Sequence, residues 1–276
     1  MSARCGKEKI QNRSNPLRNR ILAILGAIAL IVIIYFTFSN KPQKISAFDE
    51  QREKLIDSID YPNSESLVEM HNDMLRAEGS TKNTLLEQLS DEWINLNQPS
   101  IAADYLRQLA DNDPSFENYM RAGTALSSLI DYESDDQLRI NVVYGARYCF
   151  EKALEYQPED IDAKVGLAAV LVGSNTPMEG IMMLREIDTE HPGNVRANLE
   201  LGKFSVMSQQ YDKAIERFNN VLQKDSLNLQ ALYMLAQAYL GTKDTANAVK
   251  TLEKTTTLTS DSLILNQIRQ EINNLK

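Results

Sequence analysis

The stretch AIERFNNVLQKDSLNLQALYMLAQAYLGTKDTANAVKTL, residues 214–252, contains the pattern that decides the fold. A small residue, Ala214, is followed four positions later by the large apolar Phe218. The same combination recurs 34 positions further on, as Ala248 and Leu252. A period of this length, with helical spacing inside it, indicates helical pairs that repeat along the chain.

The same ladder extends toward the N-terminus in equal steps of 34 positions. Its small position is occupied by Ala146, Gly180, Ala214 and Ala248, its large position by Phe150, Leu184, Phe218 and Leu252, and its closing position by Pro158, Pro192, Ser226 and Ser260. Small residues let two antiparallel helices approach closely, and large residues fill the space between neighbouring pairs. Because one pair cannot bury its apolar face alone, the pairs must stack.

This pattern resembles the tetratricopeptide repeat (TPR), a helix-turn-helix unit with the same period. The best matches are Leu201-Gly202 with Ala214 and Phe218, and Leu235-Ala236 with Tyr239, Ala248 and Leu252. The resemblance implies an all-α TPR α-solenoid over residues 81–261, closed by a capping helix at 262–276. Its repeats are expected at about 83–116, 117–160, 161–194, 195–228 and 229–262.

The second repeat contains an insertion of about ten residues, because Pro114 and Pro158 are 44 positions apart. The surplus is the acidic stretch 131–137, which we interpret as a protruding turn that lengthens the next helix. A calcium loop does not fit, since its sixth position would be Asp136 instead of Gly and its twelfth Val142 instead of Glu.

Residues 39–80 are expected to form a juxtamembrane helical segment, and within it the pattern of residues 45–80 predicts two helices, broken near Pro62. Their apolar positions are Phe48, Leu55 and Ile59, then Leu67, Met70 and Met74. Two interpretations remain open: a degenerate first repeat or a stalk. The pattern favours the degenerate repeat.

Residues 21–38, ILAILGAIALIVIIYFTF, predict a single transmembrane helix. This uncharged run makes a helix of about 27 Å, which roughly spans a hydrocarbon core. A cleaved signal peptide is the main alternative, but the run is long for a signal core and no small-x-small cleavage pattern follows it. The basic residues of segment 1–20 outnumber those just after the run, which predicts a cytoplasmic N-terminus and an extracytoplasmic repeat domain, periplasmic in a bacterium.

The charge distribution argues against nucleic acid as a partner. The chain of 276 residues has a net charge of −9; residues 1–40 hold six Lys or Arg and only Glu8, so residues 41–276 carry a net charge of −14. Nucleic acid is captured by clustered basic residues. We therefore expect protein or peptide partners, with the lipid bilayer contacted through residues 21–38.

The sequence contains no constellation for catalysis. His71, His191, Cys5 and Cys149 are the only histidines and cysteines, and they are scattered. No phosphate-binding loop, nucleophile elbow or metalloprotease pair is present. We expect no enzymatic activity, no cofactor and no metal site.

The TPR resemblance places a partner-binding groove on the first helix of each repeat. The corresponding positions are Val165, Arg196, Leu199, Lys203, Met207, Tyr233 and Gln237. TPR domains that grip C-terminal carboxylates use Lys at the place of Val165, Leu199 and Tyr233, so that mode is not expected. A mixed apolar and basic groove suits an extended or helical peptide segment.

The predicted function is that of a membrane-anchored scaffold or adaptor that binds protein partners, in envelope protein assembly or a chaperone-like role. Two alternatives use the same scaffold: a TPR receptor that faces the cytosol, and a purely structural tether between complexes. An enzyme or ligand-binding subunit whose site depends on three-dimensional geometry is a further alternative.

Overall fold

The computed structural model describes residues 46–58 and 64–275, which belong to one compact unit. The elements in these ranges are helices: α2 (Ser46–Ser58), α3 (Ser64–Arg76), α4 (Gly79–Asn95), α5 (Pro99–Asn112), α6 (Phe116–Ser127), α7 (Asp136–Tyr156), α8 (Ile161–Val172), α9 (Pro177–Glu190), α10 (Val195–Met207), α11 (Tyr211–Lys224), α12 (Leu229–Gly241), α13 (Thr245–Thr256) and α14 (Ser262–Leu275). None of these described helices is both long and apolar enough to cross a membrane. The predicted transmembrane segment 21–38 and the basic segment 1–20 lie outside the described residues.

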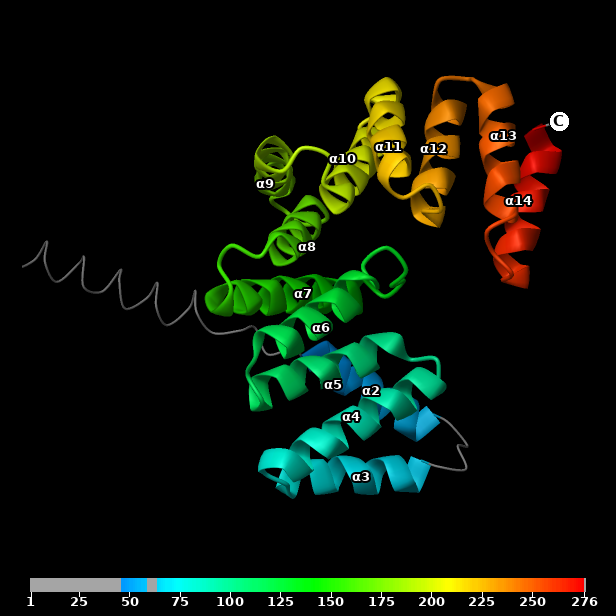
Figure 1. The fold of residues 1–276 in the computed structure, drawn as a ribbon. Helices are drawn as coiled ribbons and strands as arrows, with labels where there is room; N and C mark the ends of the chain where they lie inside the picture. The colour runs from blue at the N-terminus through cyan, green and yellow to red at the C-terminus, as the bar shows by residue number, and fades with distance from the viewer. Residues whose placement is uncertain (1–45, 59–63, 276) are drawn as a thin grey trace, which may run out of the picture. The chain divides into compact units, whose positions relative to one another are not determined.

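Five consecutive helical pairs follow one another from α4 to α13 (Figure 1). Each helix packs on its neighbours in the chain, and the first helices of successive pairs, α6, α8, α10 and α12, also contact one another in order. The last helix, α14, packs on α13. The predicted all-α solenoid is confirmed.

The small and large positions of the ladder lie where the pairing of helices requires them. The four small residues and the four large residues of the ladder are all buried. Gly180 shows why the small position is restricted: a Cβ atom there would lie 2.3 Å from the backbone oxygen of Ala168. Only glycine lets α9 approach α8 this closely.

Three first helices begin with the same kind of N-cap hydrogen bond, one repeat apart. The side chains of Asp160, Asn194 and Asn228 each accept a hydrogen bond from the backbone N–H three residues later, at 2.7, 2.9 and 2.9 Å. Such caps satisfy backbone donors that have no partner within the helix. The repeat period therefore sets the helix boundaries as well as the core.

The insertion lengthens α7, as the sequence predicts. This helix has 21 residues, whereas α5, α9 and α11 have 14 each. Asp135 caps its start by accepting from the backbone N–H groups of Gln137 and Leu138. The turn before it is held by a hydrogen bond from the Ser100 hydroxyl of α5 to the Glu133 carboxylate.

The two helices before the repeats do not form a repeat pair. α3 packs on α4, whereas α2 packs on α5 and α7. Phe48 and Arg52 are the buried side chains of α2, and Arg52 is only 7% exposed. The interpretation of residues 45–80 as a degenerate first repeat is therefore corrected: α2 lies across two second helices instead of continuing the stack.

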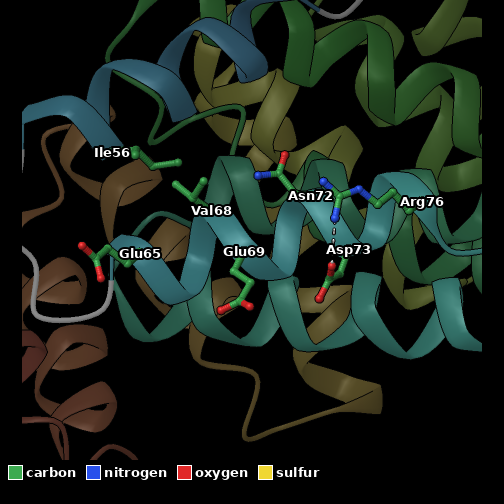
Figure 2. Close-up of a pocket in the computed structure, with 7 residues that line it drawn as sticks. All are labelled: Ile56, Glu65, Val68, Glu69, Asn72, Asp73 and Arg76. Atoms are coloured by element: carbon green, nitrogen blue, oxygen red, sulfur yellow. Dashed lines mark ion pairs between the residues drawn. The ribbon is translucent and has the colours of Figure 1, made fainter.

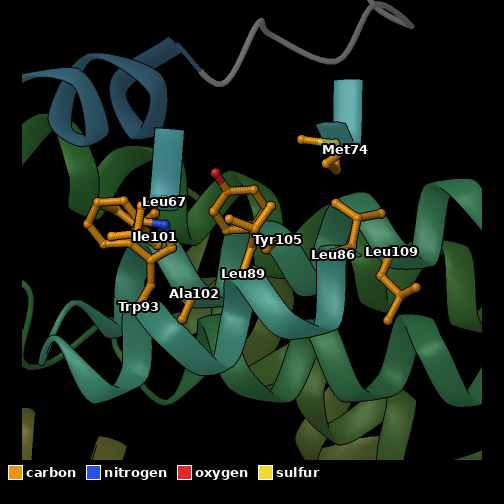
Figure 3. Close-up of a cluster of buried hydrophobic side chains, with 9 residues drawn as sticks. All are labelled: Leu67, Met74, Leu86, Leu89, Trp93, Ile101, Ala102, Tyr105 and Leu109. Atoms are coloured by element: carbon orange, nitrogen blue, oxygen red, sulfur yellow. The ribbon is translucent and has the colours of Figure 1, made fainter. Parts of the chain in front are cut away.

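The N-terminal core forms around Tyr105 of α5 (Figure 3). Its buried members are Leu67, Met74, Leu86, Leu89, Trp93, Ile101, Ala102, Tyr105 and Leu109. The Tyr105 hydroxyl lies 2.9 Å from Nδ1 of His71 on α3 and 3.5 Å from Nη1 of Arg52 on α2. One side chain thus connects three helices.

Candidate protein-binding groove

The candidate groove consists of the outward sides of the first helices α8, α10 and α12, together with α14. Residues 34 positions apart face each other there: Arg196 pairs with Asp162 at 2.9 Å, and Gln237 donates to Glu271 at 2.7 Å. The stacking of first helices extends this register across repeats, because equivalent side chains meet at each junction.

Two predicted groove residues belong to the core instead. Val165 is 1% exposed, and it packs in a cluster with Leu184 and Leu201. Leu199 is 9% exposed and packs with Phe218 and Leu235. Their placement on the groove surface is corrected, because this side of each first helix is covered by the neighbouring pairs.

The basic groove residues already have acidic partners. Arg196 contacts Asp162, and the ammonium group of Lys203 lies 3.0 Å from the carboxylate of Glu200 on the same helix. Partly exposed ion pairs of this kind contribute little free energy, but they neutralise the positive charge locally. The groove is therefore less basic than the sequence suggests.

Tyr233 and Met207 are the predicted groove residues that present apolar surface. Tyr233 is 40% exposed and Met207 is 71% exposed. Partial burial, followed by the negative charge of Glu271, raises the pKa of Tyr233. Its hydroxyl therefore remains protonated at neutral pH and is able to donate a hydrogen bond to a bound segment.

The groove contains acidic partners that reasoning from the sequence missed. Glu200 and Glu271 were not identified, although Glu271 stands one full repeat period after Gln237. A search for polar residues 34 positions apart, like the search made for apolar residues, would have identified the contact between Gln237 and Glu271. The same rule finds Arg121 on α6, which lies 3.1 Å from Glu87 on α4.

The described residues offer no cluster of three or more His, Cys, Asp or Glu side chains that could hold a metal ion. Cys149 is buried, and burial raises the pKa of its thiol, which disfavours the reactive thiolate. His71 is held by Tyr105 in the N-terminal core, and His191 is exposed at the end of α9.

Comparison with protein families supports the repeat assignment. Residues 205–262, from the end of α10 to the start of α14, match the tetratricopeptide repeat family model. A comparison of the sequence with curated proteins gives no match.

Solved structures with the same kind of fold are distant in sequence. The thermophilic TPR protein TTC0263 from Thermus thermophilus is 14% identical, with a TM-score of 0.52 over 70% of this chain and 98% of that one. The type IV pilus biogenesis factor PilW is 18% identical (TM-score 0.48; 71% and 87% covered). YrrB, described as a TPR protein with an unusual peptide-binding site, is 18% identical (TM-score 0.41; 67% and 91% covered). The family match and the fold shared with TTC0263 support a TPR solenoid.

Proposed function

We propose that this protein is a membrane-anchored TPR adaptor that binds a protein segment in the groove of α8, α10, α12 and α14. The observation that carries the proposal is the exposure of Tyr233 and Met207 among groove cations that already have acidic partners. Helical-repeat surfaces of this kind bind extended or helical peptides through apolar anchors surrounded by polar groups.

The neutralised groove favours a particular kind of segment. Arg196 and Lys203 are paired with acidic side chains, so a free carboxylate would have to compete with Asp162 and Glu200. An apolar, largely uncharged segment does not have to displace Asp162 or Glu200 from their ion pairs, and it covers the ring of Tyr233 directly. Such segments are exposed in proteins that are still folding or assembling, which supports the role of an assembly adaptor.

The membrane part of the proposal rests on the sequence. The uncharged run 21–38 follows six basic residues, a combination that favours a single-pass anchor with its N-terminus in the cytoplasm. The repeat domain is then extracytoplasmic, and its clients are envelope or secreted proteins.

The test is photo-crosslinking in cells from the groove of the full-length protein. A photoreactive amino acid replaces Tyr233, and in a matched control it replaces Glu216, an exposed residue of α11. We expect Tyr233 to capture envelope or secreted proteins, and we expect Met207→Asp to reduce that capture several-fold with unchanged helicity by circular dichroism.

Two results would contradict the proposal. Equal capture from Tyr233 and Glu216 would show that the groove has no special affinity for clients. Capture of cytosolic proteins would reverse the topology and favour a receptor that faces the cytosol.

A further inference from the structure

The outer side of α3 carries apolar surface at the start of the helical stack. α3 buries Leu67 and Met74 against α4. On the outer side of the same helix, Val68 is 38% exposed and Leu75 is 61% exposed. The opposite end of the stack is covered by α14, as expected for solenoids, whose terminal units shield the last apolar face. The outer side of α3 has no equivalent cover within the described residues.

A hollow lies beside this surface, between α3 and the end of α2. It has a volume of about 440 Å³, and Ile56 of α2 and Val68 of α3 form its apolar part. Figure 2 shows these two side chains close to each other, with the charged side chains of α3 around them. The remaining lining residues are Glu65, Glu69, Asn72, Asp73 and Arg76.

The charges beside the hollow have one dominant sign. Glu65, Glu69 and Asp73 are spaced four residues apart, so they form one stripe along the helix. Arg76 lies 3.7 Å from Asp73. Glu65 and Glu69 have no ion-pair partner among the described residues. An incoming cation would therefore meet two carboxylates that need not release a partner.

We propose that the outer side of α3 docks a cationic amphipathic helix of a partner protein. Val68 and Leu75 are seven residues apart, about two helical turns, which matches the spacing of apolar side chains on one face of a partner helix. Lys or Arg residues beside that apolar face then lie over the stripe of Glu65, Glu69 and Asp73. This surface is separate from the groove.

The charge pattern argues against a second copy of the same chain as the occupant. A symmetric dimer through α3 brings the same patch of both copies together. Two stripes with three carboxylates each would then approach, and juxtaposed like charges disfavour association. A positively charged partner neutralises these carboxylates, whereas self-association brings them close to one another.

The test measures binding of a defined peptide to the full-length chain in a non-ionic detergent. The probe is a fluorescein-labelled helical peptide of about five turns, made of Ala, Leu and Lys, with leucines seven positions apart and lysines beside them. Fluorescence anisotropy gives its Kd. We expect the double change Glu65→Lys and Glu69→Lys, and separately Val68→Ser, to weaken binding at least tenfold without loss of helicity.

A matched control separates this site from the general acidity of the chain. Glu186 and Glu190 are two exposed glutamates four residues apart on α9, so their change to Lys alters the net charge equally. Unchanged binding in that variant supports the proposal, as does weak binding of peptides with Leu replaced by Ala or Lys replaced by Glu.

The same binding measurements distinguish other occupants of the surface and other binding sites for the probe. An equal loss in the Glu186 and Glu190 variant, or no binding by the unaltered chain, would overturn the proposal. So would dependence on Tyr233 instead of α3, which assigns the peptide to the groove. Tighter binding after deletion of residues 2–20 would show that the chain's own basic segment occupies the surface, and it would overturn the assignment to a partner protein.

Discussion

At the scale of single residues, the hydrogen bonds of Tyr105 determine how the N-terminal core responds to protons. Burial raises the pKa of Tyr105 to about 12, so its hydroxyl remains a donor. Its oxygen accepts from Arg52, and in the His71 tautomer that carries its proton on Nε2, the Tyr105 hydroxyl donates to Nδ1. A protonated His71 could no longer accept this bond, and its charge would lie near the Arg52 guanidinium. Burial and Arg52 together lower the pKa of His71 to about 4.

His71 should make the free energy of unfolding depend on pH. Its pKa of about 4 in the folded chain lies below the ordinary value of about 6.5, so the unfolded state binds the proton more readily. Stability is therefore full above about pH 6.5 and is lost as the pH falls toward 4. Because His71 is partly exposed, we expect this contribution to be about 1–2 kcal/mol.

The measurement is urea unfolding of the full chain at pH 7 and pH 4.5, compared with His71→Asn. Asparagine keeps an acceptor close to the position of Nδ1 but does not titrate, so the variant should lose less stability than the unaltered chain. Identical losses in both chains would show that His71 is not the group responsible.

At the scale of helices, α2 is attached differently from the helices of the stack. It contacts α5 and α7 and inserts Phe48 and Arg52, while Glu50, Glu53 and Lys54 of the same helix are exposed. The ion-pair partner of Arg52 is Asp49, one turn earlier on α2 itself, and the Arg52 guanidinium lies 6.0 Å from the Tyr105 ring centroid. Phe48 is the fully buried apolar side chain of α2, and Leu55 and Ile56 of the same helix pack partly buried against the N-terminal core.

The change Phe48→Ala should release α2 while the stack remains folded. Truncating a buried phenylalanine costs about 3–5 kcal/mol when the rest of the structure stays in place, a large loss for a helix with one fully buried apolar side chain. We expect trypsin to cut after Arg52 at least tenfold faster in this variant, as followed by mass spectrometry. Glu53→Ala, on the exposed side of α2, should leave the rate unchanged; equal acceleration in both variants would contradict the role of Phe48.

The helices differ in how well the sequence predicts their neighbours. The regular spacing of Ala214 and Phe218 with Ala248 and Leu252 predicted both the helical pairs and their buried residues. α2 and α3 were predicted as helices, but the partners of α2 were not, because its packing on α5 and α7 depends on contacts remote in sequence. Val165 and Leu199 were misplaced for a related reason: the exposed arc of a first helix depends on how closely the next repeat approaches.

At the scale of the whole repeat region, each helical pair is stabilised by the contacts it makes with the neighbouring pairs. α14 ends this series by burying Ile268 and Ile272 against Leu252 and Ala236. Without α14, the apolar side of the last pair would face water. A solenoid built from neighbour contacts depends strongly on such a terminal cover.

A charge in this cover should expose the end of the stack. Ile268→Asp places a carboxylate at a position 2% exposed, whereas the matched Gln267→Asp places it on the exposed side of α14. Burying an unpaired charge and losing the isoleucine should cost about 3–5 kcal/mol. We expect a lower Tm and stronger binding of a hydrophobic dye for Ile268→Asp alone. A similar response from Gln267→Asp would mean that α14 does not cover the core.

The position of α2 also has a mechanical consequence. From α8 to α13 each helix is held by near neighbours, so tension on the chain ends would release one repeat after another, each adding about 120 Å of contour length. Between residues 46 and 156, α2 also contacts α5 and α7, so extension of that part must in addition break contacts between segments that are remote in sequence. Under tension the repeats from α8 to α13 would therefore separate one after another, whereas the part nearest residue 46 would first have to lose the contacts of α2 with α5 and α7.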